Sequence, residues 1–193
     1  MKRKIVAVLG LPGSGKTEAI NYLLKKLNWP KVYFGEVTFD ELKKKRLAIN
    51  EANERKIREE LRVKHGQDYY AKKVIEKIEK IPSGNILVES LYSWVEYLEF
   101  KKKFGDNFKA VAVYAPPKIR YARLAKRPTR PLTSAEAQGR DYAQIENLFQ
   151  AGPIAMAEYT LINEGNLKDL YQQIDKIIKG FKLQSPANAG DSN

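Results

Sequence analysis

The chain of 193 residues contains no cysteine and only one histidine. The lack of cysteine excludes disulfide bonds and thiolate metal sites, and it leaves the redox compartment open. No apolar run is long enough to span a bilayer, and the short apolar run near the N-terminus lacks a signal-peptide cleavage pattern. We therefore expect a cytoplasmic protein without a membrane segment. The histidine, His65, lies in a predicted helix break, where a turn or capping role is favoured over catalysis.

Positive charge is what the composition has in excess. The chain has 35 lysines and arginines against 23 acidic residues, a formal net charge of +12. Part of this charge lies in lysine-rich runs, residues 43–46 and 101–103, where such residues usually solubilise a helix face. The resulting field would attract a polyanion, either a nucleotide or a nucleic acid. Nucleic acid is the less favoured partner, because no aromatic–basic binding motif accompanies the charge.

Residues 10–17 read Gly-Leu-Pro-Gly-Ser-Gly-Lys-Thr and match the phosphate-loop pattern G-x-x-x-x-G-K-[ST]. A buried-strand pattern at residues 5–9 precedes the loop, and a helical apolar stripe follows it. Glycines allow the loop to curl so that its N–H groups face phosphate oxygens, and the helix N-terminus adds partial positive charge. The alternatives are a glycine-rich turn with a solvated lysine and a dinucleotide fingerprint, whose glycine spacing is absent here.

The motif gives each position a role. The loop residues expected around the phosphates are Gly10, Pro12, Gly13, Ser14 and Gly15. Lys16 would reach the β- and γ-phosphates of ATP, and the Thr17 hydroxyl would be a ligand of Mg²⁺. We therefore predict that the chain binds a nucleoside triphosphate.

Strands alternate with helices along the rest of the chain. The remaining runs typical of strands are residues 32–34, 86–89, 108–114 and 159–162. The predicted helices cover residues 51–80, 93–103, 117–127, about 133–149, and 167–179 before Gly180. The first of these ranges has a break at residues 65–68. Another helix is predicted to begin near Phe39, after a capping box of Thr38 and Glu41. This alternation predicts one α/β/α domain over residues 1–183, with a parallel sheet and a ligand site at the carboxyl ends of its strands. Residues 184–193 are predicted to be a disordered tail.

Glu89 ends a predicted buried strand that should lie beside the first strand. Its carboxylate would then emerge near Thr17 and the Mg²⁺. There it could hold a metal-bound water or accept a proton from an acceptor hydroxyl. The alternative is an ion pair between Glu89 and a neighbouring lysine at the sheet edge.

The chain resembles P-loop kinases of the nucleotide kinase group. It is most similar to dephospho-CoA kinases and to the uncharacterised archaeal P-loop family described as dephospho-CoA-kinase-like or adenylate-kinase-related. Beyond the phosphate loop, the segments that carry the resemblance are residues 35–37, 58–62 with Gly66 and Ala71, 115–116, 123–127, 140–141 and 163–167. The resemblance implies a three-layer P-loop NTPase fold with five parallel strands in the order 2-3-1-4-5 and a helical lid over about residues 126–140.

The resemblance also implies roles for single residues. The arginines expected to close over the transferring phosphates are Arg123, Arg127, Arg130 and Arg140. Arg123 would in addition stack on the adenine, and the loop from Asn163 to Gly165 would contact that base. The alternatives are a solvated basic face for Arg123 and Arg127, and a plain strand-to-helix turn, with Asn166 as N-cap, for the loop.

Two departures from the relatives concern the phosphate acceptor. Phe39 stands where relatives often have an arginine, and Glu89-Ser90-Leu91-Tyr92 replaces their usual Asp-Gly with an arginine soon after. The leading hypothesis is a kinase that uses ATP and Mg²⁺ to phosphorylate a small nucleotide-like acceptor. The alternatives are a non-catalytic or slowly hydrolysing nucleotide-binding module and a nucleic-acid-linked ATPase. The sequence leaves the oligomeric state open.

Overall fold

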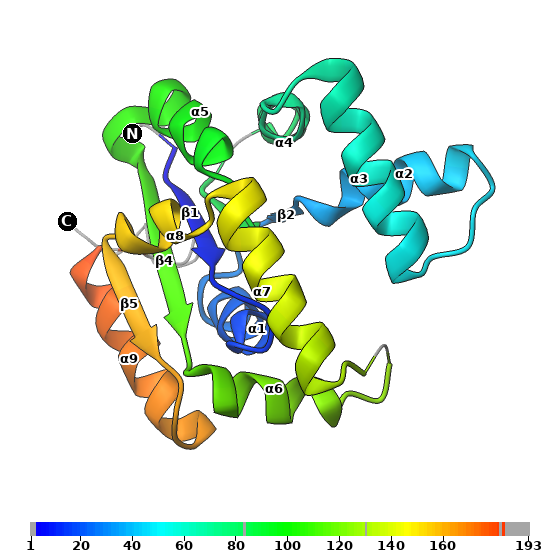
Figure 1. Ribbon diagram of the computed structural model, residues 1–193. Helices are drawn as coiled ribbons and strands as arrows, with labels where there is room; N and C mark the ends of the chain where they lie inside the picture. The colour runs from blue at the N-terminus through cyan, green and yellow to red at the C-terminus, as the bar shows by residue number, and fades with distance from the viewer. Residues whose placement is uncertain (1–2, 83, 130, 182, 184–193) are drawn as a thin grey trace.

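A parallel sheet of five strands forms the centre of the computed structural model (Figure 1), which describes residues 3–82, 84–129, 131–181 and 183. The strands are β1 (Ile5–Leu9), β2 (Lys31–Tyr33), β3 (Ile86–Glu89), β4 (Phe108–Tyr114) and β5 (Tyr159–Ile162). Their order is β2-β3-β1-β4-β5, which confirms the predicted topology. Arg130 and the predicted tail over residues 184–193 lie outside the described residues.

Helices cover both faces of the sheet. They are α1 (Lys16–Leu27), α2 (Gly35–Lys44), α3 (Glu51–His65), α4 (Tyr69–Glu79), α5 (Trp94–Phe104), α6 (Pro117–Ala125), α7 (Ser134–Leu148), α8 (Ala151–Ala155) and α9 (Leu167–Gly180), with a 3₁₀ turn at Gly105–Asn107. Within the described part of the chain, no helix is long and apolar enough to cross a membrane.

The central strand β1 is buried on both of its faces, as its continuous apolar run predicts. Ile5 and Leu9 point into a core shared with α4 and α5. Val6 and Val8 point into a second core shared with α1 and α9. Because successive side chains of a strand alternate between faces, one five-residue run holds both outer layers against the sheet.

The register places the functional segments at one edge of the sheet. Val8 pairs with Glu89 on β3, and Leu9 pairs with Ala112 on β4. The phosphate loop, which begins at Gly10, therefore starts level with the end of β3 and inside the end of β4. This is the carboxyl edge at which ligands bind in open parallel sheets.

Most element boundaries lie within two residues of the predicted ones. Helices α5 and α7 each begin with a capping box, Ser93 with Glu96 and Thr133 with Glu136. The helix expected near Phe39 begins earlier, at Gly35, and Thr38 lies inside it because its buried hydroxyl is hydrogen-bonded to the Tyr70 hydroxyl at 2.8 Å. The short helix α8 was not predicted, and Gly180 is the last residue of α9 rather than its cap.

The predicted lid over residues 126–140 combines two kinds of structure. Residues 126–129 and 131–133 have no regular helix or strand, and residues 134–140 are the first half of α7. The backbone N–H of Leu132 donates to the carbonyl of Leu124 at 3.2 Å, so this segment returns to the end of α6. Its closure over a ligand stays a prediction.

Candidate nucleotide-binding site

The phosphate loop has a backbone that only glycine tolerates at three positions. Gly10, Gly13 and Gly15 have φ values of 143°, 78° and 103°. A Cβ on Gly10 would overlap the carbonyl oxygen of Val113, and one on Gly15 would overlap the Nδ2 of Asn163. The glycines are therefore required both for the left-handed backbone and for the close approach of neighbouring strands.

The same loop packs against α6. A Cβ on Gly13 would lie 2.7 Å from the carbonyl oxygen of Arg120. Pro12 is buried, and its carbonyl accepts a hydrogen bond from the Arg120 guanidinium at 3.1 Å. Helix α6 thus supports the loop from outside the sheet.

Helix α1 presents an open N-terminus to the loop. Its N-cap, Gly15, has no side chain to cap the first turn. Ser14 is buried, its Oγ has no hydrogen-bond partner within the described structure, and the Thr17 side chain is exposed at the start of α1. Unpaired N–H groups and the helix dipole make such a terminus an anion site.

Lys16 folds back over the loop. Its Nζ donates to the carbonyl oxygens of Gly10 at 2.7 Å and Leu11 at 3.1 Å. Desolvation first, and then the charges of Arg140 and Arg127, together lower the pKa of Lys16 to about 7. A bound polyanion would offset both effects and favour the ammonium form.

Three further predicted residues lie close to this lysine. The charges of Arg140 and Arg127 act on Lys16, and the carboxylate of Glu89 acts on it with the opposite sign. Arg127 is exposed in the segment after α6, whereas Arg140 is half-buried on α7. The fold therefore gathers Lys16, Glu89 and two of the predicted arginines around the phosphate loop.

Glu89 is also paired with a lysine. Its Oε2 accepts a hydrogen bond from Lys31 Nζ at 2.6 Å, and its side chain is 12% exposed. This is the ion pair that the sequence left open as the alternative to a catalytic or metal role. The bond occupies only Oε2, so Oε1 stays available for a water or a proton.

Magnesium would depend on the nucleotide for most of its ligands. Among the described residues, no group of three or more histidine or carboxylate side chains could hold a metal ion. Mg²⁺ keeps near-octahedral geometry and is usually held by one or two protein groups, phosphate oxygens and water. The two residues predicted as its ligands are Thr17, at the start of α1, and Glu89, at the end of β3, and this role stays a prediction.

A cavity of about 320 Å³ adjoins the loop on the side of α9. It is lined by Gly15, Glu18, Arg123, Asn163, Gly165, Asn166 and Leu167. Four of these are residues predicted to bind the nucleotide. Arg123 donates through Nη2 to the carbonyl of Asn163 at 3.0 Å, while its buried Nη1 has no hydrogen-bond partner within the described structure. An unpaired buried donor of this kind fits a polar ligand in the cavity.

Asn163, which lines this cavity, also holds the phosphate loop through its side chain. Its side chain is buried, and Nδ2 donates to the carbonyl of Ser14 at 2.7 Å. Its backbone N–H donates to the carbonyl of Tyr114 at 2.8 Å. Asn163 therefore tethers the phosphate loop to the ends of β4 and β5. Asn166 caps α9, as the plain-turn alternative predicted.

Aromatic side chains gather beside the ends of β2 and β3. Burial raises the pKa of Tyr33, and the nearby Tyr92 and Glu89 raise it further. The rings of Tyr33 and Phe39 have centroids 6.0 Å apart. Phe39 and Tyr92 thus flank Tyr33 beside the ends of β2 and β3, where the resembled kinases often have arginines.

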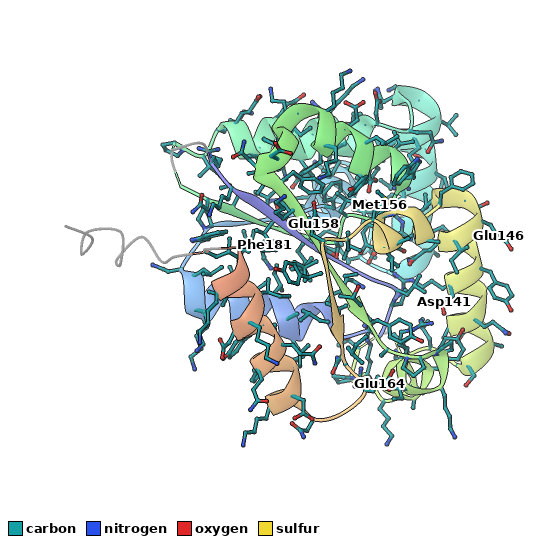
Figure 2. The ribbon with its side chains drawn as sticks, turned by 90° about the vertical axis from the view of Figure 1, so that its left-hand side faces the viewer. Asp141, Glu146, Met156, Glu158, Glu164 and Phe181 are labelled. Atoms are coloured by element: carbon teal, nitrogen blue, oxygen red, sulfur yellow. The ribbon has the colours of Figure 1, made fainter. Side chains whose placement is uncertain are left out.

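Sequence reasoning missed two buried residues that hold the loop. Arg120 is 3% exposed, donates through Nε to the carbonyl of Ala115 at 2.9 Å, and pairs with Asp141 on α7. Asp141 lies on the inner side of α7, with Glu146 on the outer side (Figure 2). Gln150 is fully buried and donates through Nε2 to the carbonyl of Gly10 at 3.2 Å. The motif of residues 140–141 hinted at Asp141, but no local pattern marks the other two.

Sequence relatives cover the chain almost completely. A UPF0200 protein of Staphylothermus marinus is 32% identical over 195 residues, 100% of both chains. A UPF0200/UPF0201 protein of Archaeoglobus fulgidus is 31% identical over 182 residues, 92% of this chain and 56% of that protein. The chain thus spans little more than half the length of the second relative. A family model described as AAA domain matches residues 6–145.

Solved structures share the fold at low sequence identity. Shikimate kinase from Bacteroides thetaiotaomicron has a TM-score of 0.59 at 15% identity, over 93% of this chain and 99% of its own. Shikimate kinase from Acinetobacter baumannii, in complex with shikimate, has a TM-score of 0.58 at 20% identity, over 95% and 97%. These likenesses establish a P-loop kinase-like fold, and the resemblance to dephospho-CoA kinases in particular stays a prediction. From its sequence relatives, the chain belongs to the UPF0200 family, and residues 6–145 are its AAA domain.

Proposed function

We propose that the protein is a kinase that transfers the γ-phosphoryl group of ATP to a hydroxyl or phosphate of a small nucleotide-like acceptor. The observation that carries this proposal is the electrostatic setting of Lys16, which Arg127 and Arg140 approach closely enough to lower its pKa. Three cations around one loop are costly unless an anion binds between them. A transferring phosphoryl group needs this arrangement, because its charge spreads over several oxygens in the transition state.

Each of the proposed site residues would have a separate role in the transfer reaction. An acceptor oxygen would attack the γ-phosphorus, the bond from that phosphorus to the β–γ bridging oxygen would break, and ADP would leave. Glu89 would receive the acceptor proton, and Lys16 with Arg127 and Arg140 would neutralise the developing charge. Magnesium, held by Thr17 and the phosphates, would add further neutralisation.

The donor base is proposed to bind in the cavity beside Arg123. Arg123 lines that cavity, and Gly165 lines it from the loop after β5. The donor would then extend from this cavity along the phosphate loop to Lys16. A lid over residues 126–140 would close on the phosphates, and its amide hydrogen exchange should slow when ATP and acceptor are both present.

The direct test is a transfer assay with a panel of acceptors. Purified protein with Mg·ATP would be incubated with nucleosides, nucleoside monophosphates and dephospho-CoA, and both ADP and phosphorylated product would be measured. We expect stoichiometric product with at least one acceptor. Tight Mg·ATP binding without transfer to any of them would contradict the kinase proposal.

One observation favours a second function, a nucleotide-binding module that hydrolyses ATP slowly or not at all. Glu89, the proposed base, is held by Lys31 at 2.6 Å. Phe39 and Tyr92 stand where the resembled kinases often have cations for the acceptor. If this second function is correct, ATP turnover should be slow and unaffected by every acceptor in the panel.

A further inference from the structure

Two donors from distant parts of the chain share the carbonyl oxygen of Gly10. Lys16 Nζ lies 2.7 Å from this oxygen, and Gln150 Nε2 lies 3.2 Å from it. Gly10 is buried, and a buried carbonyl that loses its donors costs about 1–3 kcal/mol. The oxygen is thus doubly satisfied in the nucleotide-free protein.

Nucleotide binding would compete for one of these donors. An ammonium has three N–H donors, and Lys16 uses two of them on the carbonyls of Gly10 and Leu11. Contacts to both the β- and γ-phosphates need two donors, so they would withdraw Lys16 from at least one of these carbonyls. Gln150 comes from the connection between α7 and α8, outside the loop. It does not need to move when Lys16 turns to the phosphates.

The side-chain amide of Gln150 points its NH2 group at Gly10 and leaves its oxygen without a hydrogen bond. Only Nε2 can donate to a carbonyl, so the contact fixes which way the amide points. Its Oε1 is then buried without a hydrogen-bond partner within the described structure. The side chain is fully buried, and the Gln150 backbone N–H donates to the carbonyl of Gln144 at 3.1 Å. The protein therefore leaves an unpaired oxygen here and keeps the bond to the loop.

We propose that Gln150 is a positioning residue of the phosphate loop, which retains the Gly10 carbonyl so that Lys16 can turn to the phosphates. The part of this inference that concerns nucleotide binding rests on the proposed function. It predicts that loss of the Gln150 donor has little effect on the stability of the loop while Lys16 stays hydrogen-bonded to the carbonyl. The loop is destabilised only when Lys16 leaves that carbonyl.

The first arm of the test measures nucleotide affinity by calorimetry. Gln150→Met keeps the length of the side chain and removes its donor, and it should weaken Mg·ATP binding by roughly tenfold or more. Gln144→Met is the matched control, because Gln144 is also buried and also has an unpartnered amide oxygen. It should change the affinity by less than about twofold. Equal affinities for Gln150→Met and the wild type would overturn the proposal.

The second arm needs no nucleotide and so separates this proposal from the proposed function. Lys16→Met and Gln150→Met would be compared singly and together by denaturant unfolding. Each single variant leaves one donor on the Gly10 carbonyl, whereas the double variant removes both. The double variant should therefore lose more stability than the sum of the two single losses. Strict additivity would overturn the shared-carbonyl argument even if ATP binds as proposed.

A measurement on the wild-type protein covers the case in which Gln150→Met does not fold. The side-chain amide protons of Gln150, observed by ¹⁵N NMR, should exchange slowly in the free protein and more slowly with Mg·ATP, when Gln150 holds the carbonyl without Lys16. Exchange that is fast in both states, or faster with nucleotide, would contradict the proposal.

Discussion

Arg120 and Asp141 form a bidentate ion pair in the interior, with Nη1 2.9 Å from Oδ1 and Nη2 2.6 Å from Oδ2. Both residues are 3% exposed. The Tyr121 hydroxyl donates to the same carboxylate at 2.9 Å, and Arg120 also holds the carbonyl of Pro12. The pair therefore connects α7, which carries Arg140, to the phosphate loop.

Asp141→Asn should destabilise the protein by about 3–5 kcal/mol, because it leaves the Arg120 cation buried without a counter-charge. The measurement is the free energy of unfolding in urea. Glu146→Gln, on the exposed outer side of the same helix, is the control and should stay within about 0.5 kcal/mol of the wild type. Similar losses for the two variants would show that the ion pair does not hold α7 in place.

Lys16→Ala should abolish Mg·ATP binding or weaken it severely, since the phosphates lose the cation of the loop. Calorimetry would measure the affinity. Lys26→Ala, in the last turn of the same helix, removes an exposed lysine far from the loop and should leave the affinity unchanged. Unchanged affinity in Lys16→Ala would exclude residues 10–17 as the phosphate site.

Binding of Mg·ATP at pH 8 should take up nearly one proton. The pKa of Lys16 is lowered to about 7, so most molecules of the free protein carry a neutral lysine at pH 8. Triphosphate binding raises the pKa again and restores the ammonium. Calorimetry in buffers of different ionisation enthalpy measures this uptake, which should be small at pH 6, where the lysine is already charged. Proton release at pH 8, or no linkage at all, would contradict the assignment.

Glu89→Gln tests whether the carboxylate is the base. With the acceptor found in the transfer assay, turnover should fall by roughly a hundredfold or more while ATP affinity stays within a few-fold. Lys31→Met is the companion variant, since it frees the carboxylate from its ion pair and should keep or raise turnover. If Glu89→Gln retained full turnover, the Lys31 pair would be the whole role of Glu89.

Ser90→Gly should make the protein about 0.5–1 kcal/mol more stable. Ser90 follows β3 with φ 67°, a conformation that strains every residue except glycine, and the resembled kinases usually have glycine there. Unfolding in urea would measure the gain. The same substitution at Ser93, an extended helix cap with φ −109°, removes a capping hydroxyl and should lower stability. A loss at Ser90 would mean that its side chain contributes more than the strain costs.

The features of the fold and the site that could be predicted are those determined by residues close together in the sequence. The phosphate loop depends on glycine and lysine spacing within eight positions, and the buried strands depend on short apolar runs. Thr38 shows the limit of local signals. Its spacing to Glu41 matches a capping box, but the prediction was wrong, because α2 begins at Gly35 and the Thr38 hydroxyl is hydrogen-bonded to Tyr70 instead.

The missed site residues are defined by contacts between distant segments. Arg120 lies on a basic helix with Arg123, and its sequence context does not say which of the two turns inward. Gln150 reaches Gly10 across 140 positions of sequence. The contacts of Arg120 and Gln150 with the phosphate loop could not be predicted without knowing how α6, α7 and α8 pack against it.

Asn163 joins the two halves of the candidate site in one rigid contact. Its carbonyl accepts from Arg123 beside the cavity, and its side chain holds Ser14 in the phosphate loop. A shift on one side must therefore be transmitted to the other. We expect a whole nucleotide to bind more tightly than its separate nucleoside and triphosphate fragments imply, because each half of the molecule would order the surface that receives the other.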